Sequence, residues 1–533
     1  MSFLHGIEVV EIDTGARPIR TVRSSVIGIV GTAPDADVST FPLNQPVLIA
    51  GSRRKAGRLD TKGDSRGTLP DAVETILDQA GAMIVVVRVA EGADEDATMA
   101  NVIGGVGTND QLEGVHALRA AQTDLELTPR ILLAPGWTHQ RVEGGITDIN
   151  VDSGGSNYSP HPDVTISGTG TGAKAHAEVD GSGTITGIKI DDPGSGYDSS
   201  PTVSISDPGG SGAKAVVNVS GGVIQSVTVT DQGDGKYSQD ATVTVTDNQN
   251  TPTAGTFSLT VQDGYVTAVT VDDGGSGYSN DISVSFSDSG GSGASASANT
   301  GIVRNATVSE LLGIADRMRA IIFADGPDTT DADAIAYRKD FGFRRVFVCD
   351  PWALKSNGES FRSIQASAVW AGVTARVDQD TGFHVSPSNK PVFGVVGTTR
   401  QVDWSFGDTA SRANYLNSEE VNTIIRQDGF RTWGNRTASS DPKWAFINVV
   451  RTNDMIAESI VRAHLWAVDR NITTTYFEDV IEGVNDYLRT LEARGWIAGG
   501  RAWADPELNT PSEFQKGRVY FNYEFSPYYP AEH

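Results

Sequence analysis

The side chains of this chain best suited to acid–base catalysis or metal binding are its eight histidines. Serine-type catalysis needs a His base that an Asp orients, and a helical zinc site needs two His at a fixed spacing. None of the histidines has neighbours that would supply either arrangement. They are His5, His116, His139, His161, His176, His384, His464 and His533. The sequence therefore predicts no catalytic residue, no bound metal and no cofactor.

Two other features could carry chemistry, and structural roles explain both better. Cys349, the one cysteine, stands in the apolar run FRRVFVCDPW, which favours a buried thiol and excludes an intrachain disulfide. Gly28 and Gly31 follow a strand-like run as in a phosphate-binding loop, but the Lys and hydroxyl residues that end such a loop are missing. We predict a simple turn at 28–31.

Composition excludes several classes of function. The 533 residues include 42 Lys plus Arg and 67 Asp plus Glu, a formal net charge of -25. Because this charge would repel a phosphate backbone, we expect no nucleic-acid partner. No apolar stretch of about 18 residues and no signal peptide is apparent, so neither membrane insertion nor general secretory export is predicted.

The segment 424–437, IIRQDGFRTWGNRT, is the most informative part of the chain. A helix-forming run is predicted to end at Asp428-Gly429, and a tight turn follows it. The residues that crowd this turn are Gly429, Trp433, Gly434, Asn435 and Arg436. The segment closely resembles the signature of tail sheath proteins from contractile-tailed bacteriophages.

Other segments resemble the same family. They are residues 6–37, 41–44, 84–89, 129–131 with 135–136, and 455–469. The resemblance implies an α/β core of subtilisin-like fold that lacks a catalytic triad, an α+β C-terminal domain, and no enzymatic activity. Together these segments sample nearly all of the chain outside its central region.

The central region, residues 142–303, has a composition of its own, with 19 acidic and 4 basic residues and 28 of the 59 glycines. Glycine-rich segments that end in tyrosine recur at Tyr158, Tyr197, Tyr237 and Tyr278. This spacing indicates four repeats of about forty residues. Alternating strands at 186–191, 202–206, 227–231 and 242–246 predict an inserted all-β, glycine-rich repeat domain on the surface.

Three roles stay open for these repeats. Calcium-binding β-rolls need an Asp in every nonapeptide, whereas the comparable Asp here recurs about once per forty residues. Weak carbohydrate or host-surface binding and simple surface decoration are the other two roles.

Outside the insertion, strand-like and helix-like segments alternate. Strands are predicted at 130–134, 320–324 and 345–349, and helices at 307–318, 331–338 and 363–371. Such alternation predicts a parallel sheet with crossover helices. We assign this core to residues 23–141 together with 304–394.

A second, α+β domain is predicted for residues 395–533. A helix at 418–426 would lead into the signature turn, followed by a strand at 444–450 and helices at 452–468 and 476–494. The first of these two helices would bury Met455, Ile456, Ile460, Val461, Leu465 and Val468. The second would turn outward Glu478, Asp479, Glu482, Asp486 and Arg489. The resemblance makes this outward face a candidate for contact with an inner tube, and plain solvation is the other interpretation.

Strand-prone segments near both chain ends are candidates for pairing with another strand. In a predicted N-terminal arm, residues 1–22, they include Ile7, Val9, Val10, Ile19 and Val22. Near the C-terminus they include Val519, Phe521, Tyr523 and Phe525. The resemblance implies that such arms add strands to neighbouring subunits of an open helical array. Relatives continue after the last strand, so we expect an exchanged C-terminal arm to be missing here.

The resemblance implies a structural subunit of a contractile tail sheath. Such subunits form a homo-oligomer, a helical stack of rings, expected to be hexameric, around a tail tube protein, with baseplate and tail terminator proteins at its ends. Contraction would drive the tube through the host envelope for genome delivery. Assembly in the host cytoplasm and residence in the virion follow from this role. A headless contractile injection particle would share every motif, while a repeat-based adhesin would leave the rest of the chain unexplained.

Overall fold

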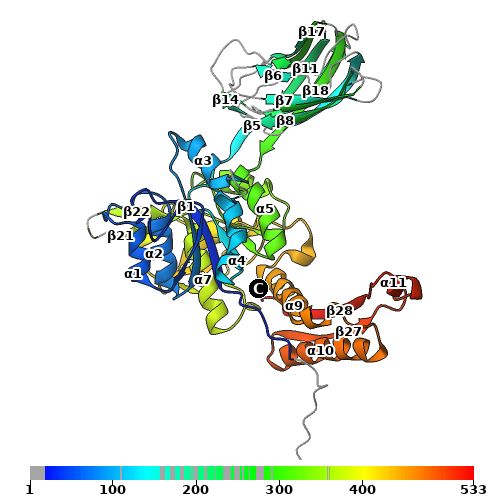
Figure 1. Ribbon diagram of the computed structural model, residues 1–533. Helices are drawn as coiled ribbons and strands as arrows, with labels where there is room; N and C mark the ends of the chain where they lie inside the picture. Colours follow the sequence, from blue (N-terminus) through cyan, green and yellow to red (C-terminus); the bar gives the residue numbers. More distant parts are fainter. Residues whose placement is uncertain are drawn as a thin grey trace, which may run out of the picture. The chain divides into compact units, whose positions relative to one another are not determined.

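The computed structural model describes residues 18–107, 111–356, 358 and 360–532, with only the backbone of the strands named below described between 142 and 303. Residues Ile7, Val9 and Val10 of the predicted arm therefore lie outside the described residues. The chain divides into two compact units (Figure 1). One holds the described residues up to His139 and from Thr307 onward, and the other is Gln140–Ala306.

The first unit is built on a six-stranded sheet. In spatial order its strands are β2 (Pro46–Ala50), β3 (Met83–Val89), β1 (Val26–Thr32), β4 (Ile131–Leu133), β19 (Ile321–Asp325) and β20 (Val346–Cys349). All neighbours pair in parallel except β2, which is antiparallel to β3. The predicted parallel sheet, and its predicted strands at 130–134, 320–324 and 345–349, are confirmed within one or two residues.

Helices cover both faces of this sheet, because successive strand residues point to opposite sides (Figure 1). Ile27 and Ile29 pack toward α2 (Leu69–Gln79) and α7 (Ala366–Asp380). Val26 and Val30 pack on the other side. The helices there are η3 (Gly114–Ala120), α4 (Ala121–Leu125), α5 (Ala306–Met318) and α6 (Asp331–Lys339). Two apolar layers thus enclose the sheet, and the buried thiol predicted at Cys349 is confirmed.

One prediction for this core was wrong, and one predicted helix begins later than expected. Residues 28–31 form no turn but lie inside the buried strand β1. Glycine is needed there for close packing, since a Cβ at Gly28 would stand 2.9 Å from the Cβ of Pro129, and one at Gly31 would meet the Thr68 hydroxyl. The helix predicted at 363–371 begins at Ala366 instead, because the residues before it pair as β22 (Phe361–Ile364) with β21 (Ala353–Ser356).

The element types of two segments in the C-terminal region were also predicted wrongly. Residues predicted as the helix 418–426 contain the strand β25 (Thr423–Arg426), paired with β26 (Phe430–Trp433). Residues predicted as the strand 444–450 instead begin α9 (Ile447–Ala463). The β-branched Ile447 and Val450 suggested a strand, but burial against the sheet core places both on one helical face.

The predicted apolar face of 452–468 is only partly buried. Met455 and Ile456 are buried, but α9 ends at Ala463, and Val461, Leu465 and Val468 are 63%, 78% and 62% exposed. The helix predicted at 476–494 is confirmed as α10 (Thr474–Ala493). It packs on a two-stranded ribbon of β27 (Ile497–Ala504) and β28 (Phe521–Pro527).

Shorter elements complete the first unit. They are α1 (Arg53–Ala56), η1 (Gly57–Leu59), α3 (Glu95–Ile103), β23 (Pro391–Val392), β24 (Gly397–Thr398), α8 (Arg412–Ser418), η4 (Pro442–Trp444), η5 (Leu465–Ala467) and α11 (Pro511–Gln515).

The second unit contains a twelve-stranded sheet, and its first and last strands, β5 and β18, pair with each other from Val142↔Val303 to Ser156↔Ser292. Both ends of this unit therefore lie side by side. Its strands are β5 (Val142–Ser156), β6 (Asp163–Ser167), β7 (Lys174–Val179), β8 (Ile185–Asp192), β10 (Thr202–Pro208), β11 (Ala213–Ser220), β12 (Val223–Asp231), β13 (Thr242–Thr244), β15 (Phe257–Gln262), β16 (Tyr265–Val271), β17 (Asp281–Ser289) and β18 (Ser292–Val303), with a separate pair β9 (Gly194–Ser195) and β14 (Thr253–Ala254). The four repeat tyrosines lie outside the described residues, so the fourfold repeat stays a prediction.

Candidate assembly surfaces

The signature segment forms a β-hairpin. Strands β25 and β26 are joined by the turn 427–429, in which Asp428 and Gly429 have φ of 51° and 96°. Such left-handed backbone suits Asp and Gly in a short hairpin turn, so these two residues end a strand where a helix end was predicted. Gly434 has φ of 132°, and a Cβ there would stand 3.0 Å from the Cα of Asn422. The hairpin thus needs glycine at both places.

The remaining signature residues connect this hairpin to three other parts of the chain. Arg436 donates to both carboxylate oxygens of Glu532, at 3.0 and 2.6 Å, and its guanidinium lies 5.3 Å from the ring of Phe446. The main-chain carbonyl of Asn435 accepts from the N–H of Ile447, where α9 begins, at 3.0 Å. Trp433 is only half-buried and packs edge-on against Trp404 at 5.0 Å.

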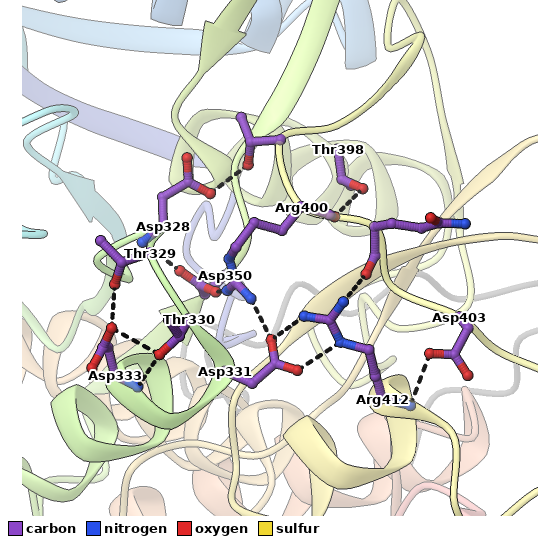
Figure 2. Close-up of polar contacts among 12 residues, drawn as sticks. Asp328, Thr329, Thr330, Asp331, Asp333, Asp350, Thr398, Arg400, Asp403 and Arg412 are labelled. Atoms are coloured by element: carbon purple, nitrogen blue, oxygen red, sulfur yellow. Dashed lines mark hydrogen bonds and ion pairs between the residues drawn. The ribbon is translucent and has the colours of Figure 1, made fainter.

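A cluster of arginine and aspartate side chains fills the carboxyl end of the sheet beside β19 and β20 (Figure 2). Arg412 donates to both oxygens of Asp331, at 2.7 and 2.9 Å, and Arg400 binds both Asp331 and the fully buried Asp350. Burial alone would raise the pKa of Asp331, but the hydrogen bonds from Arg412 and Arg400 outweigh it and lower the pKa. The cluster ties the segment that carries Arg400 and Arg412 to the sheet.

This position is where open α/β sheets usually bind ligands. Here the chain's own guanidinium groups occupy it. Deeper in the same edge, Asp325 is fully buried and accepts from the main-chain N–H and the hydroxyl of Ser367 at 2.7 and 2.8 Å. Burial raises the pKa of Asp325 to about 7. Because Ser367 is fully buried too, this hydroxyl–carboxylate pair is closed to substrate.

Three ion pairs with little exposure join helix α9 to the six-stranded sheet and its covering helices. Arg451 binds Asp378, Asp454 accepts from Arg345 at 2.6 and 3.2 Å, and Glu458 lies 2.9 Å from Arg130. The α9 members of these pairs stand at spacings of three and four residues, so one stripe of the helix carries all three. The sequence interpretation considered only the apolar stripe of this helix. Charged residues at helical spacing signalled the second stripe, but their burial could not be seen without the partners.

The predicted outward face of α10 is exposed at Glu478, Glu482, Asp486 and Arg489 and half-exposed at Asp479. Arg489 bonds to Glu482 at 2.6 Å, so two of its charges neutralise each other locally.

Behind α10, β28 pairs with β27, and its Tyr523 and Phe525 pack against the α10 core. Phe521 packs against the ring of Phe477 at 5.4 Å. Val519 precedes the strand, so the strand predicted from 519 begins two residues later.

The described residues of the predicted N-terminal arm lie along the C-terminal helices. Ile19 packs against the cluster formed by α10 and the ribbon. Thr21 Oγ1 lies 3.0 Å from the Tyr487 hydroxyl, and the N–H of Val22 donates to the Ser459 hydroxyl at 3.0 Å. Residues 18–22 therefore contact their own chain.

Metal sites and membrane spans are not found among the described residues. There, no group of three or more His, Cys, Asp or Glu side chains is placed to hold a metal ion. No helix within the same residues combines the length and apolar character needed to cross a bilayer.

Comparison with known proteins identifies the family. Three domain descriptions match separate stretches of the chain, in sequence order. They are the tail sheath protein Gp18 domain III N-terminal region at residues 24–89, the phage tail sheath protein central domain at 296–438, and the phage tail sheath C-terminal domain at 439–533. The chain is a member of the contractile tail sheath family.

Individual sheath relatives differ in their sequence identity to this chain and in how much of it they match. A prophage major tail sheath protein of Pseudomonas aeruginosa is 45% identical over 233 residues, which are 43% of this chain and 60% of that protein. The tail sheath protein of Escherichia phage P2 is 26% identical over 99% of this chain and 93% of its own length.

Among solved structures, two contracted sheaths share the fold. They are the sheath complex of the extracellular contractile injection system PVC and the helical sheath of the anti-feeding prophage AFP, both with a TM-score of 0.52 over 100% of this chain. The matched regions cover 96% of the PVC chain and 98% of the AFP chain, at 13% and 14% sequence identity. Sheath proteins of phages are virion components, and the mixed α/β architecture described above is that of the family.

Proposed function

We propose that this chain polymerises helically around a tail tube and, by contracting, drives the tube through the host envelope to deliver a genome. The observation that carries this proposal is the similarity to the phage P2 tail sheath protein along 99% of the chain. The role is structural rather than catalytic. In support, the sheet edge where α/β enzymes bind substrate is filled by Arg400 and Arg412 paired with the chain's own carboxylates.

Subunits would be linked by strand addition at the β27–β28 ribbon. Within the described residues this ribbon has two strands and hence two edges without a partner strand. Main-chain groups along such edges pair readily with an extended segment from another chain. Residues 1–17, which contain Ile7, Val9 and Val10, have the β-propensity to supply that segment. The ring would hold six subunits, with baseplate and tail terminator proteins closing the ends of the stack.

The outward face of α10 would meet the tube. Its exposed Glu478, Glu482 and Asp486 outnumber Arg489, so a tube surface that carries lysine or arginine would be complementary. Such contacts between exposed charges orient partners without binding them tightly, which suits a surface that must release the tube on contraction.

A headless contractile injection particle is the second candidate. It is favoured by the likeness of fold to the sheaths of the PVC and AFP systems, at 13% and 14% identity. Capsid genes beside this gene would support the phage role, and their absence would support the headless particle.

Electron microscopy of the purified chain tests the proposal. Wild-type protein should form striated tubes. Deletion of residues 1–17 should abolish long tubes while leaving the melting temperature unchanged, because an arm that pairs with a neighbouring subunit adds nothing to the core of its own. Proteolysis supplies the control. The N-terminal residues should be cut first in monomers and protected in tubes, and equal cutting in both states would contradict strand exchange.

A further inference from the structure

A groove rich in arginine runs between the segment 18–23 and the C-terminal end of α9. It has a volume of about 690 Å³. Four guanidinium groups line it, those of Arg20, Arg23, Arg130 and Arg462, which together we call the arginine groove. Glu126 is the one carboxylate residue among its lining residues. Such an excess of cations is unusual in a chain whose net charge is -25.

The two exposed arginines of the groove form no ion pair with any described residue. Arg20 and Arg23 are both exposed, and the Arg23 guanidinium makes only a weak 3.5 Å approach to the sulfur of Met83 within the described residues. Each guanidinium carries five N–H donors, and within the described residues none of the ten donates to a carboxylate.

The inner arginines share a single carboxylate. Glu458 lies 2.9 Å from Arg130, 2.8 Å from Arg462 and 3.5 Å from Arg319. Burial alone would raise the pKa of Glu458, but the charge of Arg130 and the hydrogen bond from Arg462 hold it below its ordinary value. Glu458 is thus ionised. Its single negative charge is shared among three arginines, so the wall of the groove keeps a net positive charge.

Apolar side chains border the same groove. Leu125, Leu127 and Trp466 are among its lining residues. A cationic groove with an apolar border fits a segment that carries both carboxylates and apolar side chains.

We propose that the arginine groove binds carboxylate side chains of a neighbouring copy of this chain, an ionic contact between subunits that is separate from strand addition. This rests on the proposed sheath function. With 67 acidic against 42 basic side chains, every neighbouring copy presents an excess of carboxylates. A nucleic acid is the less favoured occupant, because the net charge of -25 repels it.

Zero-length cross-linking can identify the occupant directly. Arg20→Lys and Arg23→Lys keep the positive charge and supply amines that a carbodiimide joins to a carboxylate in contact. Mixing isotopically heavy and light copies before assembly separates links between subunits from links within one. We expect mixed heavy–light peptides that join these lysines to Asp or Glu residues. Links only within one subunit would overturn the proposal.

Charge reversal measures the contribution of the groove to assembly. Arg20→Glu with Arg23→Glu should raise the protein concentration needed for tube formation roughly tenfold or more, which corresponds to about 1.4 kcal/mol per contact. The matched control is Arg54→Glu with Lys55→Glu on α1, which changes the net charge equally at residues outside the groove. Salt should weaken wild-type assembly toward the level of the groove variant and affect that variant little.

The outcomes separate this inference from the proposed function. Wild-type protein that forms no tube under any condition contradicts the sheath function itself. Wild-type and groove-variant proteins that assemble alike, at all salt concentrations, contradict the groove alone. Nucleic acid that copurifies with wild-type protein and not with the groove variant would also overturn the carboxylate assignment.

Discussion

The six-stranded sheet and the contact between α9 and that sheet, which we call the α9 junction, are both buried. Different forces stabilise these two regions. Around β1 and β20 the contacts are apolar on both faces, with residues such as Phe323, Phe347 and Trp370 fully enclosed. Along α9, buried apolar residues such as Ile447 and Ile456 alternate with buried ion pairs such as Arg345–Asp454.

This difference determines how each region responds to amino-acid substitution and to salt. Apolar burial depends on volume and shape, and it involves no charges that salt could screen. A buried ion pair contributes little net stability when intact, because desolvation offsets the attraction, yet losing one partner leaves an uncompensated charge. Sequence changes in the sheet should therefore act by volume, and changes in the junction by charge balance.

The largest expected effect lies in the sheet core. Trp370 is fully buried and packs edge-on against Phe347 at 5.1 Å. Trp370→Ala should lower the free energy of unfolding by about 4 to 5 kcal/mol, because the vacated volume cannot close completely. Chemical denaturation measures this, and Trp370→Phe should lose clearly less. Equal losses for both variants would show that indole polarity, not volume, matters there.

The junction should show a sharper dependence on pairing. Arg345→Met alone should cost about 3 to 5 kcal/mol, because Asp454, whose side chain is 1% exposed, would lose its buried partner. Arg345→Met with Asp454→Leu should recover most of that loss. A double variant as unstable as the single one would mean that packing, as in the sheet, and not charge balance determines stability at this pair.

A pH titration distinguishes the two regions further through Asp325. Its folded-state pKa is raised from 3.8 to about 7, so the folded protein binds a proton that the unfolded chain has released above 3.8. Stability from this group is therefore full below pH 3.8 and falls as pH rises toward 7. Relative to wild type, Asp325→Asn should gain stability through this window, by up to about 1.4 kcal/mol per pH unit. A constant difference across the window would contradict the assignment.

The signature aromatic should matter less to stability than its place in the motif suggests. Trp433 is half-buried against Trp404, so Trp433→Ala should cost roughly 1 to 2 kcal/mol, below the 3 to 5 kcal/mol typical of an enclosed ring. Thermal unfolding together with tube formation provides the measurement. Normal melting with failed assembly would place the indole at a contact between subunits.

The smallest effect is expected from removing residues 142–303. Because the first and last strands of that unit pair with each other, a short Gly-Ser linker can join residues 141 and 304, and the stability of the sheet unit should change by less than about 1 kcal/mol. Denaturation and electron microscopy of the variant check folding and assembly. Insoluble protein or absent tubes would show that the sheet unit depends on the insertion.

The sequence predicted the sheet far better than the C-terminal region. Strands β4, β19 and β20 are short apolar runs between amphipathic helices, a local pattern that requires no knowledge of partners. The helix predicted at 418–426 overlooked the β-branched Thr423, Ile424 and Ile425, which favour the strand found there. The strand predicted at 444–450 failed for a different reason, because tertiary burial, which no window of sequence shows, made 447–450 a helix despite its β-branched residues.

On the surface of the molecule, the exposure of a single side chain was easier to predict from the sequence than the pairing of two side chains. The outward charges of α10 follow from helical periodicity alone. Arg400 and Arg412 were missed, because the carboxylate they share, Asp331, lies 69 residues before the first of them. The groove arginines Arg130 and Arg462 were missed for the same reason. Long-range charge pairing leaves no periodic trace in a single sequence.

The β5–β18 ladder has a consequence for how such a chain can evolve. Since the strands that open and close the inserted unit are each other's neighbours, from Val142↔Val303 onward, no strand of the six-stranded sheet belongs to the unit. A single recombination event between two genes could therefore exchange the whole segment while every other residue keeps its register. The sheath lattice and the segment are then free to diverge at different rates, the lattice under the constraint of its own symmetry and the segment under that of whatever surface it meets.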